Sequence, residues 1–525
     1  MKNIFKLLFV LQFSFCFSQN NQPQITITSI ENDNITETLT INYSLEDIDG
    51  DNCEVWIKSS LDGGEFFETI PSSEVIGDVG LIVSPSEQRT LVWDYANLSS
   101  SINAVNIRLL ATDNKDVDIA EMVSQVDQNK LLTTLQNIVG PRHYSTAPEN
   151  LTAVRNYVSN AFNSANLQTE AQNFQFASTT MQNIIGCKPG AKDESITFII
   201  DGHFDGVSGS PAADDNGSAV SGMLEALRIL SQYSFEHSIR FIGFDAEELG
   251  LIGSSNYVQT GIKSYEDIQG VLNLEMIGYF SDQPNSQNLP TGFNILFPAL
   301  YQEIVNDEFK GNFIVNIGNT TSNPLINAFS SAAATYVPQL KVLNAEVPGN
   351  GEIVPDLRRS DHASFWDGGF QAVLLTDTAE FRNDNYHTAN DEISTLDLSF
   401  MQQVVQTTLA TVAKLAVPIS LGFDDADLST LSTIEHEHST SPEFFIYPNP
   451  SNGLLSLRVK DVLSAFKTRI EVYDVTGKRL HHEVLNINSG TSNTEINLKN
   501  LTPSSYILIV HLENTTKSLS FIISE

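Results

Sequence analysis

The sequence predicts an α/β fold, a mostly parallel sheet flanked by helices, with a β-sandwich on either side of it along the chain. In the middle of the chain, apolar runs of strand length alternate with helix-like segments, as they do in parallel sheets. Both ends carry short strand-like runs between Asp, Gly, Asn and Ser turns. A chain of 525 residues is also too long for one compact domain. We expect a signal peptide at 1–18, a sandwich at 19–117, the α/β domain at 118–418, a linker at 419–442 and a second sandwich at 443–525.

The first 18 residues have the pattern of a secretory signal peptide. Lys2 and Lys6 precede an apolar stretch that is too short to span a bilayer comfortably. Ser18 suits a cleavage site, and Phe15 is too bulky for lipid attachment at Cys16. We therefore expect a secreted or cell-surface protein without stable membrane insertion.

Residues 19–117 indicate an Ig- or fibronectin-like sandwich, because their strand-length runs alternate or cluster apolar residues between turns. Trp56 and Trp93 lie in two of these runs, and we expect both to anchor the core. Beyond the signal peptide the cysteines are Cys53 and Cys187, which fall in different expected domains. We expect two unpaired thiols and no disulfide.

Residues 118–418 carry the alternation of strands and helices. Apolar residues at three- and four-residue spacing predict amphipathic helices, and short continuous apolar runs predict buried strands. The predicted helices are 121–139, 151–166, 218–233, 249–260, 324–336 and 396–416. The predicted strands are 195–202, 238–245, 270–276 and 371–377.

Residues 419–442 are polar and acidic without a periodic pattern, which predicts a linker. Within it, Glu435 to His438 alternates Glu and His, but no second cluster of ligands lies nearby, so we interpret this tract as solvated linker. The whole chain has a formal charge of −36. Such acidity disfavours nucleic acid and anionic membranes as partners, and it is typical of a protein that stays soluble in a salty or extracellular medium.

The C-terminal segment contains two motifs of its own. A YPNP-x-x-G sequence at 447–453 opens it, and a Y-D-x-x-G-K turn follows at 473–478. Together they resemble the C-terminal sorting domain of the type-nine (Por) secretion system of gliding bacteria. The resemblance implies outer-membrane secretion machinery as a partner, export to the outside, and removal of the domain.

Metal-binding side chains follow the ends of the predicted strands. They are His203, Asp205, Asp215, Glu247, Glu248, Glu275 and His387. Because the carboxyl ends of parallel strands share one edge of a sheet, we expect these side chains to converge. Imidazole nitrogens and carboxylate oxygens are ligands that zinc takes. Two ions about 3–4 Å apart need a bridging carboxylate, further ligands for each ion and a bridging water, so the sequence predicts a two-metal site.

Two neighbouring pairs in this set divide the work. Asp205, two residues after His203, can hydrogen-bond the second ring nitrogen of that histidine and fix its tautomer. Successive side chains point in different directions in an extended or turn conformation. Of Glu247 and Glu248, one can therefore bind metal while the other faces the water.

The same residues lie in motifs that follow one another along the chain. The motifs are HFDGV, AADDNGSA, FDAEELGLIGS, NLEMIGY, RRSDHASF and YHTANDE. Over residues 118–418 they resemble metallopeptidase family 28, which includes leucyl aminopeptidases, aminopeptidase Y and glutamate carboxypeptidase. The resemblance implies a phosphorylase/hydrolase-like fold, two zinc ions per chain and peptide substrates.

The resemblance also implies a role for each residue. It gives His203, Asp215 and Glu275 to one zinc ion, and Asp215, Glu248 and His387 to the other, with Asp215 bridging. It implies a cis peptide bond between Asp215 and Asn216. Many relatives have aspartate at the position of Glu275, so the fine geometry and the metal preference here can differ from theirs.

Three further roles follow from the resemblance. Glu247 is the general base that takes a proton from the attacking water and returns it to the leaving amine. Tyr386 steadies the oxyanion, and Arg359 either shares that task or holds the substrate. For Asp361 and His362 a structural role and a substrate contact both stay open.

Several functions compete. A secreted aminopeptidase leads, because carboxylates near the metals, among them Glu247 and Glu275, suit the free amine of a peptide. A carboxypeptidase would need a cationic patch, for which Arg358 and Arg359 are candidates. A glutaminyl cyclase, which shares the fold but uses one zinc, is disfavoured by the complete two-metal set. A catalytically dead binding protein has no chemical need for Glu247.

Overall fold

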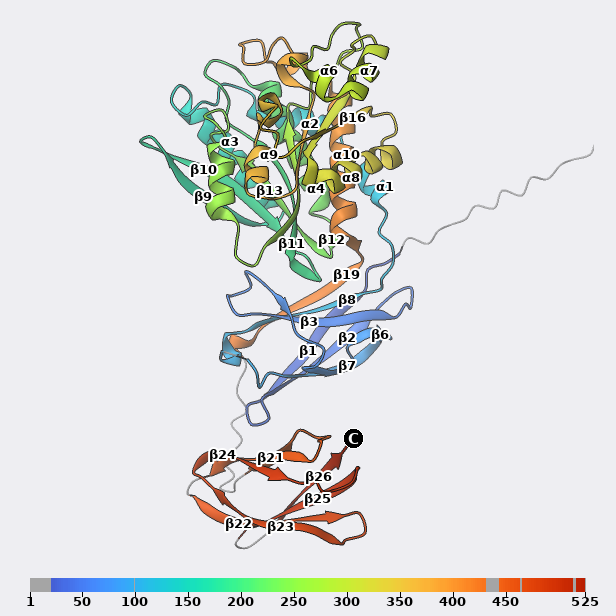
Figure 1. The fold of residues 1–525 in the computed structure, drawn as a ribbon, viewed down its shortest axis with the longest axis vertical. Helices are drawn as coiled ribbons and strands as arrows, with labels where there is room; N and C mark the ends of the chain where they lie inside the picture. Colours follow the sequence, from blue (N-terminus) through green and yellow to red (C-terminus); the bar gives the residue numbers. More distant parts are fainter. Residues whose placement is uncertain (1–19, 99, 431–442, 463–464, 513–515, 525) are drawn as a thin grey trace, which may run out of the picture. The chain divides into compact units, whose positions relative to one another are not determined.

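The computed structural model describes residues 20–430 except 99, and residues 443–524 except 463–464 and 513–515. It consists of two compact units, Met1–Ser432 and Thr433–Glu525, and each is described on its own (Figure 1). The first unit holds the N-terminal sandwich and the α/β domain, and the second is the C-terminal sandwich. The expected signal peptide and the Glu435–His438 tract lie outside the described residues.

The α/β domain is built on one eight-stranded sheet with the strand order β16-β15-β17-β14-β11-β13-β10-β9. Its centre is parallel: β11 pairs with β13 and β14, and β14 pairs with β17. Antiparallel pairs lie toward both edges, so the predicted mixed, mostly parallel sheet is confirmed. The strands are β9 (Gln168–Phe176), β10 (Thr179–Lys188), β11 (Asp193–His203), β13 (His237–Phe244), β14 (Asp267–Glu275), β15 (Ile314–Asn319), β16 (Val342–Val347) and β17 (Ala372–Thr376).

The four predicted strands are the four central ones, β11, β13, β14 and β17. The sequence missed the outer strands. The reason is clear at the edge strand β9, where Phe174 is the one fully buried residue and the rest are exposed or half-buried. A strand that buries so few side chains carries a weak hydrophobic pattern.

Helices cover both faces of the sheet (Figure 1). One core contains buried side chains from α2, α3, α4, α8 and α10, and the other contains side chains from α6, α7 and α9. The helices are α1 (Ile119–Ser124), α2 (Gln128–Ile138), α3 (Pro148–Ser164), α4 (Ala219–Leu230), α5 (Ile252–Asn256), α6 (Phe293–Leu296), α7 (Pro298–Asn306), α8 (Asn323–Tyr336), α9 (His362–Asp367) and α10 (Leu398–Ala416).

One predicted helix is divided in two. The predicted helix 121–139 breaks between α1 and α2, where the side chain of Asp127 accepts a hydrogen bond from the amide of Asn129. An aspartate in this position caps the start of a helix, so it ends the preceding one. The periodicity of apolar residues continues through the break and conceals it.

The N-terminal sandwich has two sheets, with the orders β1-β2-β7-β5 and β19-β8-β3-β4, and β6 pairs with β3. Its strands are β1 (Gln24–Asp33), β2 (Thr38–Glu46), β3 (Cys53–Ser60), β4 (Glu68–Thr69), β5 (Val75–Gly77), β6 (Gly80–Val83), β7 (Ser86–Asp94), β8 (Asn106–Thr112) and β19 (Leu421–Asp427). A small sheet of β12 (Ser234–Phe235) and β18 (Pro418–Ile419) precedes β19 in the chain.

The prediction of a linker at 419–442 was wrong for its first part, because residues Leu421–Asp427 form the strand β19. The chain returns from the α/β domain and adds an antiparallel strand beside β8, so the sandwich uses residues from both sides of that domain. Two acidic side chains of β19 have partners: Asp424 accepts the amide of Ile27, and Asp425 forms an ion pair with Arg108. Because three of the seven residues of this strand are aspartates, its composition resembled a linker.

Trp56 and Trp93, the two tryptophans of the N-terminal sandwich, lie in different surroundings. Trp93 is buried in the sandwich core, as predicted. Trp56 is half-buried on the other face of its strand, and its indole N–H donates to the carbonyl of Ala191 in the α/β domain. The expectation of a core anchor was wrong for Trp56, because it packs between the two domains. Cys53 and Cys187 are both unpaired, as predicted.

The C-terminal sandwich has sheets of order β20-β21-β24 and β23-β22-β25-β26 around one core. Its strands are β20 (Glu443–Tyr447), β21 (Leu454–Val462), β22 (Phe466–Asp474), β23 (Arg479–Ile487), β24 (Gly490–Asn497), β25 (Ser504–His511) and β26 (Thr516–Ile523). Among the described residues of the whole chain, no helix is both long and apolar enough to cross a membrane.

Candidate functional site

The predicted metal-binding side chains converge at one edge of the eight-stranded sheet. His203 is the last residue of β11, and Glu275 is the last residue of β14. Glu247 and Glu248 follow the end of β13, and the loop after β17 brings in His387. Asp215 lies in the turn that leads into α4. The rule that parallel strands end at a common edge therefore placed these residues correctly.

Three of these side chains form a buried group that we call the His203 cluster: His203, Glu247 and Glu275. The Nε2 atom of His203 lies 3.2 Å from Oε2 of Glu275 and 3.8 Å from Oε2 of Glu247. It also lies 3.4 Å from Oδ1 of Asp215. Glu247 is the most distant of the three carboxylates.

The other three form the His387 cluster: Asp215, Glu248 and His387. The Nε2 atom of His387 is 3.0 Å from Oδ2 of Asp215 and 3.2 Å from Oε2 of Glu248. Asp215 thus presents one carboxylate oxygen to each histidine, so a single side chain joins the two clusters. This is the arrangement that a bridging carboxylate requires.

The backbone around Asp215 is held in place by the side chains of Asp391 and Asn216. The peptide bond between Asp215 and Asn216 is cis, as expected. The carboxylate of Asp391 accepts the amide hydrogens of Asp214 and Asp215, at 2.8 and 3.1 Å. Asn216 donates to the carbonyl of Leu274 at 3.0 Å. The sequence interpretation assigned no role to Asp391, although it lies in the YHTANDE motif, because nothing in the motif shows that this carboxylate reaches the turn before α4.

The contacts of Asp205 differ from the predicted ones. Its Oδ1 atom lies 3.3 Å from Nδ1 of His203, although the two atoms do not form a hydrogen bond. The same carboxylate accepts the amide hydrogens of Glu247 and Glu248, at 3.1 and 3.2 Å. Asp205 therefore positions the turn that carries both glutamates. On the opposite side, the hydroxyl of Ser360 donates to Oε2 of Glu275 at 2.8 Å.

The site has the unsatisfied ligand atoms that a metal requires. Both ring nitrogens of His203 and the Oε1 atom of Glu248 are buried and have no hydrogen-bond partner in the part of the chain that the structure describes. Buried polar atoms are almost always satisfied, so such atoms need an explanation. In each cluster, one ligand atom from every residue lies within 4.8 Å of the others. Two nitrogen ligands with four carboxylates match the donors that zinc takes.

Burial and mutual repulsion shift the pKa values of this group. Burial lowers the pKa of His203, but the Glu275 and Glu247 carboxylates outweigh it and raise that pKa well above its ordinary value. Burial raises the pKa of Glu247 well above its usual range, and it raises that of Glu248 to about 7. Burial also acts to raise the pKa of Asp215, but the two histidines outweigh burial and lower it. So many carboxylates in one buried place are stable together only with cations among them.

Tyr386 and Arg359 lie beside the His387 cluster. The ring of Tyr386 stacks on that of His387, with the ring centroids 3.7 Å apart. Its hydroxyl accepts a hydrogen bond of 2.9 Å from Arg359, which also forms an ion pair with Glu380. Burial raises the pKa of Tyr386, so its hydroxyl stays protonated and can donate a hydrogen bond.

The side chains of Asp361 and His362 have different surroundings in the structure. Both ring nitrogens of His362 are within hydrogen-bond distance of interior oxygens, those of Asn273 and Leu357. Burial lowers the pKa of His362 to about 4, so it is neutral and structural. Among the described residues, the buried carboxylate of Asp361 has no hydrogen-bond partner, and burial raises its pKa to about 7.

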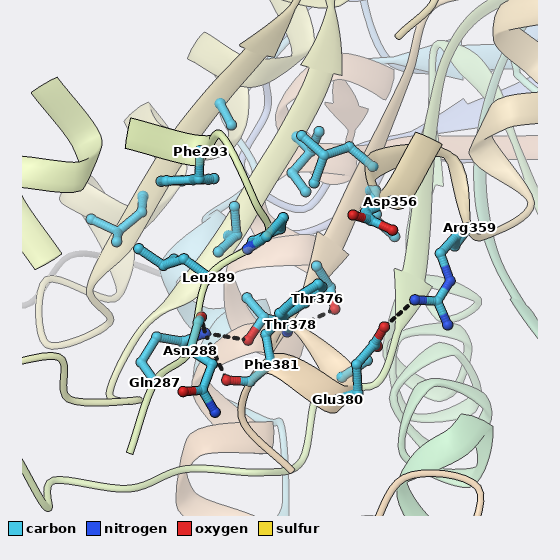
Figure 2. A pocket seen from close by; sticks show the side chains of 18 of the residues that line it. Gln287, Asn288, Leu289, Phe293, Asp356, Arg359, Thr376, Thr378, Glu380 and Phe381 are labelled. Atoms are coloured by element: carbon cyan, nitrogen blue, oxygen red, sulfur yellow. Dashed lines mark hydrogen bonds and ion pairs between the residues drawn. The ribbon is translucent and has the colours of Figure 1, made fainter. Parts of the chain in front are cut away.

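An apolar pocket opens beside the clusters (Figure 2). Its cavity volume is about 80 Å³, and Glu275 and Tyr386 are part of its wall. Figure 2 shows the Arg359–Glu380 ion pair on one side and Leu289 and Phe293 on the other. Its apolar lining comes from the sheet, from α6 and α7, and from the loops and short turns between these elements: Leu289, Pro290, Phe293, Leu300, Ile304, Phe313, Val315, Ile317, Leu343, Ala345, Leu357, Leu374 and Phe381.

Comparison with known proteins finds two family matches. Peptidase family M28 matches residues 183–412, a segment that contains all six residues of the two clusters. The secretion system C-terminal sorting domain matches residues 445–524.

Individual relatives share part of the chain. The uncharacterized protein YfbL of Escherichia coli is 28% identical over 291 residues, which cover 53% of this chain and 84% of that protein. Aminopeptidase YwaD of Bacillus subtilis is 44% identical over 106 residues, 20% of this chain and 23% of that protein. A solved structure of BSAP, a zinc aminopeptidase from Bacillus subtilis, is 26% identical with a TM-score of 0.35 and covers 46% of this chain and 51% of that one.

The sequence motifs, the converging ligands and the two family matches agree with one another. The sorting domain also indicates secretion or export to the cell surface. The chain is therefore a metallopeptidase, with a domain of peptidase family M28 followed by a secretion system C-terminal sorting domain.

Proposed function

We propose that the protein is an exported aminopeptidase with two zinc ions, which removes large apolar residues from the N-termini of peptides. The observation that carries the proposal is the carboxylate of Asp215, which faces His203 with one oxygen and His387 with the other. The relatives named as aminopeptidases support the reaction class.

The ligands would divide as follows. His203, Glu275 and Asp215 would hold one ion, and Asp215, Glu248 and His387 would hold the other. When bound, such a pair of ions polarises the substrate carbonyl and lowers the pKa of the attacking water. Glu247 lies farther from His203 than the other two carboxylates do, which leaves it free for proton transfer.

The chain's own residues supply the remaining steps. The carboxylate of Glu247 accepts a proton from the attacking water and delivers it to the leaving amine. Asp205 fixes the direction of Glu247 through its amide. Tyr386, with its protonated hydroxyl, donates a hydrogen bond to the oxygen on which negative charge develops.

The surroundings favour the amino end of a peptide over the carboxyl end. A carboxypeptidase would need an unengaged cation, but Arg359 is paired with Glu380, and Arg358 with Asp367 at 2.6 Å. Asp356, Glu380 and Glu275 line the pocket together with Arg359, so its charged groups are three carboxylates and one guanidinium. A protonated amine is attracted to a pocket in which carboxylates outnumber cations, and a carboxylate is repelled by it.

The apolar pocket suits the side chain of the first residue. It adjoins Glu275 and Tyr386, so a side chain placed in it leaves the following peptide bond near the clusters. Burying a Leu or Phe side chain contributes about 1.5–3 kcal/mol. A charged side chain would have to give up its hydration among aliphatic walls, which is unfavourable.

Hydrolysis of a panel of aminoacyl-nitroanilides tests the proposal. We expect Leu and Phe substrates to be cleaved at least about tenfold faster than Asp or Gly substrates, which corresponds to about 1.4 kcal/mol of side-chain burial. N-acetylation should abolish cleavage, and a chelator should stop it until zinc is restored. Release of C-terminal residues from N-blocked peptides would instead show a carboxypeptidase.

For export we propose the route that the sorting domain implies. The domain would engage outer-membrane secretion machinery and be removed during export. Mass spectrometry of the secreted protein tests this, since the expected product lacks residues 443–525 and residues 1–18.

A further inference from the structure

Arg142 is the most deeply buried cation near the two clusters, and no step proposed above uses it. Its side chain is fully buried, with an exposed fraction of 0%. Instead of forming a hydrogen bond to a carboxylate, its guanidinium donates to backbone carbonyls. Nε bonds the carbonyl of Phe204 at 2.8 Å, and Nη2 bonds that of Ala212 at 2.8 Å.

The third guanidinium nitrogen of Arg142, Nη1, contacts carbonyls of further residues. Nη1 lies 2.9 Å from the carbonyl of Ile138, 3.1 Å from that of Pro211 and 3.3 Å from that of Gly140. One side chain thus joins five carbonyls from three separate parts of the chain: the end of α2, the end of β11 and the turn before α4.

Two of those three segments carry metal ligands. Phe204 directly follows His203, and Ala212 lies three residues before Asp215. The backbone of Arg142 adds to the connection, since its own carbonyl accepts the amide of Gly206 at 3.0 Å. The separation of His203 from Asp215 therefore depends on how far apart this guanidinium holds the two segments.

The charge of Arg142 matters as well. Burial lowers its pKa to about 10, so it stays positive at neutral pH. Asp215, Asp391, Asp205 and Glu248 all act on it electrostatically. A buried positive charge beside so many carboxylates reduces their mutual repulsion, and without it the ligand set would open more readily.

We propose that Arg142 is a positioning residue that sets the spacing between His203 and Asp215 and so governs zinc affinity. The inference rests on the proposed two-metal function. Lysine cannot replace arginine here, because its single ammonium group cannot span the fork of carbonyls that the planar guanidinium reaches.

Zinc titration of Arg142→Lys and Arg142→Gln tests the proposal, with Arg240→Lys as the matched control. Arg240 is also a buried arginine of this domain, 4% exposed, but it binds Tyr257 and Glu266 away from the clusters. We expect zinc affinity, measured by competition with a chelating indicator, to fall roughly 10–100-fold in the Arg142 variants and not in the control. Arg142→Lys should lower kcat and leave KM near that of the wild type, because the apolar pocket is intact.

Different outcomes separate the two claims. If the wild-type protein binds no zinc, the proposed function fails. If the wild type binds zinc, and Arg142→Lys binds it equally well while losing as much thermal stability as Arg240→Lys, then Arg142 is merely structural and this inference is overturned.

Hydrogen exchange covers the case in which the Arg142 variants do not fold. The amide of Gly140 donates to the carbonyl of Pro211 at 2.8 Å, and Gly140 lies in a segment without ligands. In the wild type, saturating zinc should slow exchange at Gly140, because the guanidinium ties that segment to Ala212. Slower exchange at Gly217 but not at Gly140 would contradict the proposal.

Discussion

The two ligand clusters are built differently, although they share Asp215. In the His203 cluster the side chains are 1–10% exposed and come from the ends of adjacent strands or the turn after one. In the His387 cluster, His387 comes from a loop, has a positive φ of 58° and is 37% exposed. One position is therefore formed by the sheet itself, and the other is completed by a loop. We expect the ion in the His387 cluster to exchange more easily.

Glu247→Gln should have the largest effect. Losing a general base lowers kcat by roughly 10²–10⁴-fold, while both zinc ions stay bound because Glu247 is not one of the proposed ligands. Kinetics and zinc analysis of the purified variant measure both quantities. Glu248→Gln is the comparison, since it should lose zinc as well as activity. If Glu247→Gln keeps wild-type kcat, the division of work between the two glutamates is wrong.

His387→Ala should weaken metal binding in the His387 cluster and not in the His203 cluster. It removes the exposed ligand and leaves the His203 cluster intact, so we expect one zinc ion per chain in place of two. Activity should fall by at least roughly 10–100-fold, the range seen even for groups that only support a metal ligand. Elemental analysis counts the ions. Loss of both ions would mean that the His203 cluster cannot hold a metal alone.

Ser360→Ala should have a smaller effect, confined to the His203 cluster. It removes the hydroxyl that donates to Oε2 of Glu275, which orients that carboxylate toward His203. We expect about tenfold weaker binding of the more tightly held ion. A stepwise titration with a chelator resolves the two ions. Equal weakening of both would show that the clusters are not independent.

Proton release on zinc binding should give the smallest signal. Burial lowers the pKa of His387, but the hydrogen bonds that its imidazole donates to the carboxylates of Asp215 and Glu248 outweigh burial and raise that pKa to about 10 in the metal-free protein. The imidazole is then protonated at pH 7 and must lose that proton to bind zinc, so zinc affinity should rise with pH toward 10. Calorimetry in two buffers of different ionisation enthalpy should show about one proton fewer released by His387→Ala than by the wild type.

The sequence predicted the buried centre of the molecule better than its edges. The central strands and the ligands at their ends follow from continuous apolar runs, since a strand buried on both faces has few polar residues. The outer strands, the return of the chain as β19 and the place of Trp56 between two domains depend on contacts between distant segments. Local periodicity carries no information about such contacts.

Within the site, the sequence determined the ligand types, their order and their common edge, because strand ends and metal chemistry are local properties. Only the tertiary structure decided which oxygen of Asp215 faces which histidine, that Asp205 holds the Glu247 turn, and that Asp391, Ser360 and Arg142 support the ligands. These are distances of about 3 Å between residues far apart in the chain, and they are set by how the whole domain packs.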